Sequence, residues 1–264
     1  MKRIPLPFLL IVASLAFFTD AKSFAQVTNA IVVSTNDVVS TNAVVQNTAI
    51  IPVLRTSPTN WVVRHEGFVE IAKRGNVDLL FMGDSITDGW RGRGSNIWNK
   101  YYALQHAANF GIGGDRTEHV LWRMDHGELD GIKPKVVVLM IGTNNTGKEK
   151  DGRPRNTITQ AIEGVTAVVT EIRTKLPDSK ILLLAIFPRG GIDDLQRGQV
   201  AVINTALAKL DDVNKVKFLD IGPQFLEADG TLPKSIMPDL LHPNERGYQI
   251  WADAMNPTLD EMMK

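Results

Sequence analysis

The chain has 264 residues, with 29 basic and 29 acidic side chains and no cysteine. Because the charges balance, no net field attracts nucleic acid or an anionic membrane surface, and we expect neither as a partner. The lack of cysteine excludes thiol catalysis, disulfides and thiolate metal sites. The length allows one large domain or two small ones, with enough chain to bury a core.

Residues 1–25 have the layout of a secretory signal peptide. Two basic residues precede an apolar run that ends at Phe18, and Ser23 and Ala25 follow as small residues two positions apart. The run is shorter than the roughly 20 residues that a membrane-spanning helix needs. We therefore expect cleavage after Ala25, a secreted or periplasmic protein, and no stable membrane insertion after cleavage. An uncleaved N-terminal anchor is the alternative.

Residues 26–57 are expected to form a low-complexity linker rich in Thr, Asn and Val. The pair Thr-Asn recurs at 28, 35 and 41, and the pair Val-Val at 32, 38 and 44. Residues 27–51 contain no aromatic side chain and a single charge, Asp37, so they offer little for a packed core. Their β-branched content leaves open a strand that pairs elsewhere. The folded domain is expected over 58–264.

Five apolar runs predict strands, and amphipathic segments around them predict helices. The strands are expected at 77–82, 107–110, 136–141, 181–187 and 216–219, and the helices at 61–73, 96–105, 117–124, 157–176, 195–210 and 248–262. Nearly continuous apolar strands that alternate with such helices indicate a parallel sheet covered on both faces. Ligands of such sheets bind at the carboxyl ends of the strands.

The first strand runs into Gly83-Asp84-Ser85. All three residues are ordinary turn formers, so a simple turn explains them. The alternative is that Ser85 is a nucleophile at the mouth of the sheet, where the start of a helix would favour developing negative charge. The tripeptide alone does not decide between these interpretations.

Two further loops contain groups that suit an anion. Residues 109–117, "NFGIGGDRT", hold three glycines in four positions, which allows a close approach of backbone N–H groups. A tight turn with Asp115 as the N-cap of the next helix explains the same residues, and both can hold together. Asn144 in "GTNN", residues 142–145, either holds a turn or donates its amide to a substrate oxygen.

Asp239 and His242, in "DLLHPNERGY" at residues 239–248, are three residues apart. One helical turn brings both to the same side, and a carboxylate at that spacing can orient the imidazole. The other histidines lie within helical patterns and are interpreted as surface or structural residues: His65, His106, His119 and His126. No pair of histidines has metal-ligand spacing with an acid, so no metal site is predicted. Together the four segments supply the parts of an acyl-transfer site.

In this order the four segments resemble the blocks of the SGNH (GDSL-type) hydrolase superfamily, which carry Ser, Gly, Asn and His. The stretches "NFGIGGDRTEHVLWRM" and "KPKVVVLMIGTNN", with Asp-x-x-His near the end of the chain, are similar to the platelet-activating factor acetylhydrolase catalytic subunits. The resemblance extends over roughly residues 61 to 255. It implies a three-layer α/β/α, flavodoxin-like fold with a central five-stranded parallel sheet.

The resemblance also implies roles for five residues. Ser85 is the expected nucleophile, His242 the general base and Asp239 the carboxylate that orients it. The expected oxyanion donors are the backbone N–H groups of Ser85 and Gly114 and the side-chain amide of Asn144. No metal and no organic cofactor is expected.

From these implications we expect an exported serine esterase that hydrolyses short-chain, above all acetyl, esters through an acyl-enzyme. The expected partner is a small-molecule or glycan ester, with an acetylated glycan favoured, and no oligomeric state is predicted. Asp84, Trp90 and Arg91 are candidate substrate contacts, and for Trp90 a place at the edge of the core is equally expected. The alternatives are a lysophospholipase or other lipid esterase, and a catalytically silent glycan-binding module on the same fold.

Overall fold

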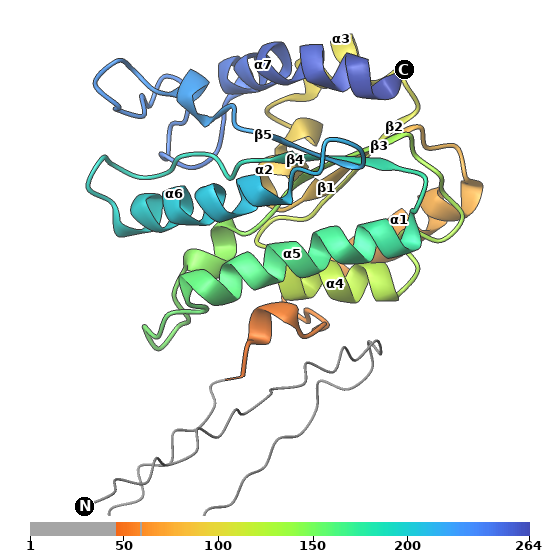
Figure 1. Cartoon of the computed structure of the whole chain (residues 1–264), viewed down its shortest axis with the longest axis horizontal. Coiled ribbons are helices and arrows are strands. Elements are labelled where there is room, and N and C mark those ends of the chain that lie inside the picture. The colour runs from red at the N-terminus through yellow and green to blue at the C-terminus, as the bar shows by residue number, and fades with distance from the viewer. Residues whose placement is uncertain (1–45, 59) are drawn as a thin grey trace, which may run out of the picture. The chain divides into compact units, whose positions relative to one another are not determined.

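A computed structural model describes residues 46–58 and 60–264. The expected signal peptide, and the expected linker up to residue 45, lie outside these residues. In the described part, five strands form one parallel sheet in the order β2-β1-β3-β4-β5 (Figure 1). The strands are β1 Leu79–Gly83, β2 Ala107–Gly111, β3 Val136–Met140, β4 Lys180–Leu184 and β5 Val216–Leu219. The expected five-stranded parallel sheet is confirmed.

Helices cover both faces of this sheet. The α-helices are α1 Asn60–Arg74, α2 Ser85–Asp88, α3 Ser95–Tyr101, α4 Thr117–Asp125, α5 Ile158–Lys175, α6 Leu195–Leu207 and α7 Glu245–Met263. Short 3-10 turns are η1 Thr48–Ile50, η2 Gly89–Arg91, η3 Thr143–Thr146, η4 Ala208–Leu210 and η5 Gly222–Phe225. Figure 1 shows α3 and α7 on one face of the sheet, and α4, α5 and α6 on the other. The α/β fold class is therefore confirmed.

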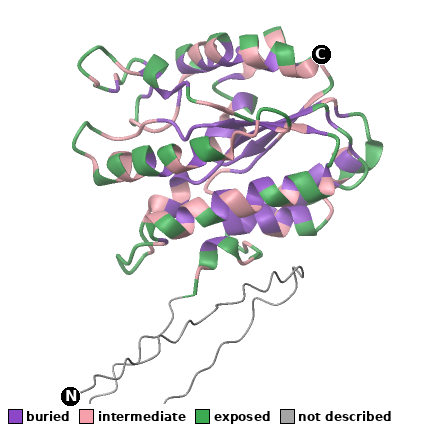
Figure 2. Cartoon of the chain, in the orientation of Figure 1, coloured by how far each residue is buried: buried purple, intermediate pink, exposed green. Residues whose placement is uncertain are grey.

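The strands are apolar on both sides because each side of the sheet faces a separate core. Leu80 and Leu139 point into the core shared with α1, α4, α5 and α6, whereas Phe81 and Val138 point into the core shared with α3 and α7. Figure 2 shows the buried sheet between half-exposed helices. Side chains alternate between the faces along each strand, and in β1 and β3 every residue is buried.

The order of the strands places a crevice beside β1. The chain passes from β1 to β2 on one side and then to β3 on the other, so the loops that follow these three strands leave neighbouring positions. Gly83 is paired with Gly111 of β2 and with Met140 of β3. A reversal of this kind at the carboxyl ends of parallel strands is where ligands bind in such sheets.

Residues 47–55, which we term the N-terminal strap, pack against the domain. We expected this segment to be part of a linker without a packed core, so that expectation is wrong for these residues. Ala49 of the strap is completely buried, and its carbonyl accepts a hydrogen bond of 2.7 Å from the hydroxyl of Thr117. Val53 donates its backbone N–H to the carbonyl of Glu118 at 3.1 Å. The folded unit thus begins ahead of residue 58, because small and polar side chains in the strap fit between α4 and α5.

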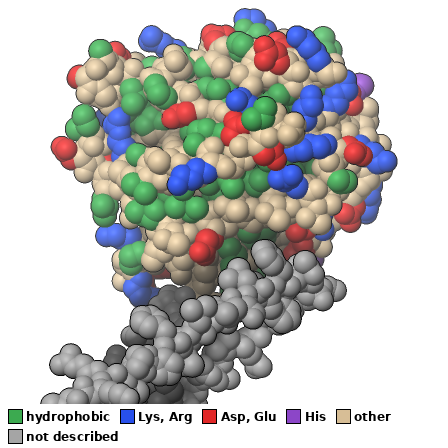
Figure 3. All heavy atoms as spheres, in the orientation of Figure 1, with side chains coloured by type: hydrophobic (Ala, Val, Ile, Leu, Met, Phe, Trp, Pro, Cys, Tyr) green, Lys and Arg blue, Asp and Glu red, His purple; other side chains and the backbone are tan. Residues whose placement is uncertain are grey.

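The surface of the domain carries both signs of charge. On the face drawn in Figure 3, basic and acidic side chains are interspersed with hydrophobic and neutral polar ones, as the balanced composition leads one to expect. Among the described residues, no helix is both long enough and apolar enough to cross a membrane.

Candidate active site

The turn after β1 is held tightly between its neighbours. A Cβ on Gly83 would lie 2.3 Å from the carbonyl oxygen of Met140, and a Cβ on Gly111 would lie 2.4 Å from the backbone nitrogen of Asp88. Both positions therefore need glycine, since real Cβ contacts do not come this close. Ser85 is the first residue of α2, so its N–H has no helical carbonyl to which it can donate.

Ser85, His242 and Asp239 form a continuous hydrogen-bonded chain, although 157 residues separate the first two. The hydroxyl oxygen of Ser85 lies 2.9 Å from Nε2 of His242. Nδ1 of the same imidazole lies 2.7 Å from Oδ2 of Asp239. The structure thus brings the predicted nucleophile, base and carboxylate together at the carboxyl end of β1. This arrangement can remove a proton from the serine hydroxyl.

The carboxylate of Asp239 is held by backbone N–H groups of the following turn as well as by the imidazole. Its Oδ1 accepts hydrogen bonds from the N–H groups of His242 at 2.7 Å and Leu241 at 3.1 Å. Leu240 takes a positive φ of 57° in this turn, and its carbonyl accepts a hydrogen bond from Gly190. Partial burial alone would raise the pKa of Asp239, but the hydrogen bonds from His242 outweigh it and lower the pKa to about 2. The carboxylate is therefore charged at any pH well above 2.

The glycine loop lies beside the serine. A Cβ on Gly113 would be 3.7 Å from the Cβ of Ser85, and the next residue, Gly114, has a φ of +79°. Asn144 stands at the end of the neighbouring strand, and its Nδ2 donates to the carbonyl of Asp115 at 2.9 Å. An amide group carries two N–H donors, so one remains for a substrate oxygen.

Asp115 anchors this loop from within the core, and it is not the N-cap that one of our interpretations expected. Arg116 takes the N-cap position of α4, and Asp115 is fully buried. Its Oδ1 accepts a hydrogen bond of 2.6 Å from Nε1 of Trp61, and its Oδ2 lies 3.0 Å from Nε of the buried Arg123. No local sequence signal identifies these long-range partners, since both lie on helices that look like ordinary amphipathic ones.

Two of the three candidate substrate contacts are structural. Trp90 is completely buried, and its ring packs against those of Tyr248 and Trp251 at centroid distances of 4.6 and 4.9 Å. It cannot stack on a substrate. Asp84 is 1% exposed, and its Oδ1 accepts a hydrogen bond from the N–H of Ile86 at 3.0 Å. Burial raises the pKa of Asp84 to about 7, although this hydrogen bond opposes the change.

The third candidate, Arg91, does border the site. Its Nη2 donates to the carbonyl of Gly111 at 3.1 Å, and its side chain is 40% exposed. It lines an open hollow of about 420 Å³ next to the serine and the imidazole. The residues around this hollow are Ser85, Asp88, Gly89, Arg91, Gly92, Arg93 and His242. The wall is thus basic and polar, with no large apolar side chain.

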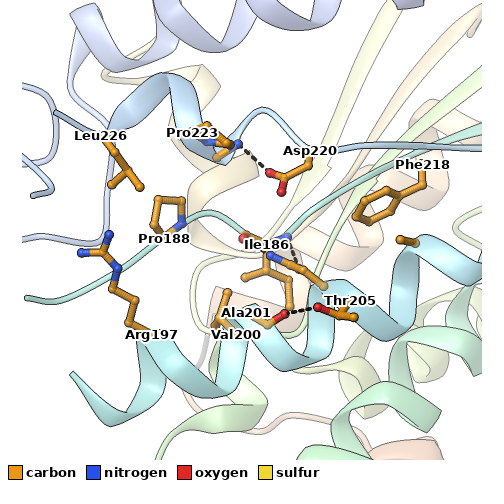
Figure 4. A pocket seen from close by; sticks show the side chains of 13 residues that line it. Ile186, Pro188, Arg197, Val200, Ala201, Thr205, Phe218, Asp220, Pro223 and Leu226 are labelled. Carbon is orange, nitrogen blue, oxygen red and sulfur yellow. Dashed lines mark hydrogen bonds between the residues drawn. The ribbon is translucent and has the colours of Figure 1, made fainter. Parts of the chain in front are cut away.

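A second groove, of about 410 Å³, lies between α6 and the end of β5 (Figure 4). It contains none of the predicted site residues. Most of its polar side chains pair with nearby backbone: Asn204 bonds the backbone of Ile186 in both directions, Thr205 donates to the carbonyl of Ala201, and Asp220 accepts from Gly222. We therefore place the chemistry at the hollow beside Ser85.

The remaining histidines have structural partners elsewhere. His65 is buried and stacks on Trp61, and the backbone N–H of Arg116 donates to Nδ1 of His119 at 3.0 Å. Desolvation, aided by nearby arginines, lowers the pKa of His119 to about 3. His106 contacts Asp78 and His126 stacks on Trp122.

Comparisons with known proteins agree with this geometry. A model of the GDSL-like lipase/acylhydrolase family matches residues 81–250. Platelet-activating factor acetylhydrolase IB subunit alpha2 of Rattus norvegicus is 39% identical over 189 residues, which cover 71% of this chain and 78% of that one.

Solved structures share the fold. A GDSL-like lipase from Bacteroides thetaiotaomicron has a TM-score of 0.59 and 16% identity, and covers 75% of this chain and 97% of its own. An acetylxylan esterase from Geobacillus stearothermophilus has a TM-score of 0.54 and 22% identity, with 70% and 93% covered.

Proposed function

The chain belongs to the GDSL-like lipase/acylhydrolase family and is a carboxylic ester hydrolase, and on that premise we propose that it is a serine esterase specific for short acyl groups, with Ser85 as nucleophile. The observation that carries the proposal is the hydrogen-bonded chain from Ser85 through His242 to Asp239 at the carboxyl end of β1. The same three hydrogen-bonded side chains make a catalytically silent binding module the less favoured alternative, because binding alone does not need them.

The proposed mechanism uses these groups in sequence. The hydroxyl oxygen of Ser85 attacks the ester carbonyl carbon while Nε2 of His242 takes the hydroxyl proton. The imidazolium is stabilised by Asp239, and it returns the proton to the departing alcohol oxygen. Water, deprotonated by the same imidazole, then attacks the acyl carbon. The bond from that carbon to the oxygen of Ser85 breaks, the imidazolium returns its proton to this oxygen, and the acid is released. In both steps the oxyanion is bound by the N–H groups of Ser85 and Gly114 and by the amide of Asn144.

The polar hollow supports a preference for short acyl groups. Each CH₂ of a longer chain gains about 0.8 kcal/mol only where apolar surface receives it. The hollow is lined by arginine and aspartate side chains and by glycine backbone, and no large aliphatic or aromatic side chain borders it. The name of the rat relative, an acetylhydrolase, points in the same direction. We therefore propose acetyl as the preferred acyl group.

A hydrophilic alcohol fits the same wall best, and an acetylated glycan is the substrate class that we favour. Arg91 and Arg93 at the mouth can donate hydrogen bonds to hydroxyl or carboxylate oxygens of a sugar. The buried Trp90 supplies no stacking platform, so recognition would rest on these donors. A lipid ester is the second candidate, because the rat relative is named after platelet-activating factor. Export, which the layout of residues 1–25 supports, favours the glycan.

The test compares substrates and variants in one screen. Release of the carboxylic acid would be measured on acetylated xylan, pectin and peptidoglycan, where it is acetate, and on a lysolipid, where it is a fatty acid, with wild type, Ser85→Ala and the control Ser95→Ala. We expect release from a glycan that Ser85→Ala abolishes and Ser95→Ala leaves intact. An organophosphonate should label Ser85 alone. Activity that survives in Ser85→Ala would refute the nucleophile, and release from the lysolipid only would select the lipid alternative. Intact mass of the exported protein would test cleavage after Ala25.

A further inference from the structure

The N-terminal strap ends beside the glycine loop of the proposed oxyanion hole. Nη1 of Arg55 donates to the carbonyl oxygen of Gly113 at 2.7 Å and to Oδ1 of Asp115 at 3.1 Å. The guanidinium also lies against the next glycine, because a Cβ on Gly114 would be 2.7 Å from Nη2 of Arg55. This arginine stands in the region that the sequence indicates as linker, ahead of residues 81–250 that match the family.

The hydrogen bond falls on the peptide whose orientation matters most. Asp115 donates its N–H to the carbonyl of Ile112 at 3.2 Å, so Ile112, Gly113, Gly114 and Asp115 form a β-turn. The φ of +79° at Gly114 is the signature of a type II turn. Type I and type II turns differ mainly by a flip of the central peptide, which here joins Gly113 to Gly114.

The carbonyl and the N–H of a trans peptide point in opposite directions. An arginine that binds the carbonyl oxygen of Gly113 therefore also fixes the N–H of Gly114, which must point away from the guanidinium. The loop borders Ser85, since a Cβ on Gly113 would lie 3.7 Å from the Cβ of Ser85. In a type I turn the central peptide would be flipped, and the same N–H would point in the opposite direction. Glycine at both central positions makes such a flip inexpensive, so the turn alone does not hold its orientation.

We infer that Arg55 is a positioning residue that locks the Gly113–Gly114 peptide with its N–H directed at the oxyanion formed at Ser85. The inference rests on the proposed function and adds to it a residue supplied by the strap.

The surroundings of Arg55 suit this task. Asp115, which shares its guanidinium, is itself held by Trp61 and Arg123 inside the core. The arginine side chain is 21% exposed, so solvent competes little for its donors. The strap behind it is anchored by the buried Ala49. The guanidinium thus connects a fixed core carboxylate to a flexible peptide, which is the geometry that a positioning role requires.

The test separates orientation of the peptide from stability of the fold. Arg55→Met would be compared with Arg116→Met, a matched control one residue beyond the turn. Arg116 is 22% exposed and pairs with Glu149 and Glu118. Kinetics on p-nitrophenyl acetate and melting temperatures would be measured for the full chain.

Removal of an oxyanion donor costs about 10²–10³ in kcat. Because Arg55→Met frees the donor without deleting it, we expect kcat to fall by about 10- to 100-fold with KM changed by less than about threefold. Arg55→Lys, which keeps one donor for the Gly113 carbonyl, should recover part of kcat. Guanidinium ion at millimolar concentration should raise kcat of Arg55→Ala and leave wild type unchanged. Arg116→Met should keep the wild-type kcat.

Three results would overturn the inference. If wild type is active and Arg55→Met is equally active, the inference about Arg55 is refuted and the proposed function is not. It would also be refuted if Arg55→Met and Arg116→Met lost kcat and melting temperature equally, and guanidinium failed to raise kcat of Arg55→Ala. A wild-type chain that hydrolyses no ester at all would refute the proposed function, and this inference with it.

Discussion

Replacing Asp84 by Asn should stabilise the protein at alkaline pH. The carboxyl group is 1% exposed, and its burial raises the pKa from 3.8 to about 7. In the unfolded chain an aspartate ionises near pH 4. Between about pH 4 and pH 7 the fold therefore retains a proton that the unfolded chain has released. Since the native state binds more protons than the unfolded state in this window, the free energy of unfolding falls as the pH rises.

The magnitude follows from the pKa. A rise from 3.8 to about 7 spans about three tenfold steps in the protonation equilibrium, each worth about 1.36 kcal/mol, so the full cost above pH 7 is about 4 kcal/mol. About 3 kcal/mol of it falls between pH 5 and pH 8. Asn has no such cost, and its side-chain oxygen can still accept the hydrogen bond from Ile86, since Asn and Asp are comparable helix caps.

The assay is thermal unfolding of wild type and Asp84→Asn at pH 5 and pH 8. For a domain of this size 1 kcal/mol corresponds to roughly 2–4 °C. We therefore expect the melting temperature of the variant, relative to wild type, to rise by on the order of 5–10 °C between the two pH values. Asp151→Asn, at an exposed position, should show no such change. An equal difference at both pH values would mean that Asp84 ionises as freely in the fold as in the unfolded chain.

Three further predictions concern catalysis. Asn144→Ala should lower kcat by about 10²–10³ with a smaller effect on KM, because its amide acts on the developing oxyanion; a change in KM alone would assign Asn144 to substrate binding. Asp239→Asn should impair turnover less than His242→Ala does, because Asp239 only orients the base His242. Near-full activity of His242→Ala would refute that assignment. Among p-nitrophenyl esters of two to twelve carbons, kcat/KM should be highest for acetyl, and a maximum at eight carbons or beyond would promote the lipid esterase.

The framework of this fold is readable from the sequence because burial on both faces leaves a strong local signal. Each expected strand overlaps an observed one. The signal is strongest for the strands at 79–83 and 136–140, which are buried at every position. The helix at 157–176 was equally clear from its apolar spacing. The ends were less accurate: β4 stops at Leu184, three residues before the apolar run does. Where a strand ends depends on pairing with its neighbour, which no single segment reveals.

The site was predictable to the extent that its groups stand in recognisable loops. The position of Ser85 directly after a strand, and the spacing of Asp239 and His242, are enough to predict these three residues from the sequence. The burial of Trp90 is not predictable from the local sequence, because it comes in large part from Tyr248 and Trp251 of α7, about 160 residues further along the chain. Arg55 was missed altogether. It lies in a stretch without periodicity, and its only significance is a contact with a loop about 60 residues away.

The tryptophans are divided between the two cores, so intrinsic tryptophan fluorescence can follow each side of the sheet separately. Trp61 and Trp122 belong to the layer with α1 and α4, and Trp90, Trp98 and Trp251 to the layer with α3 and α7. Replacing either set by Phe would leave indole emission from one side of the sheet only. Unfolding curves of the two variants would then reveal whether both layers melt in a single transition.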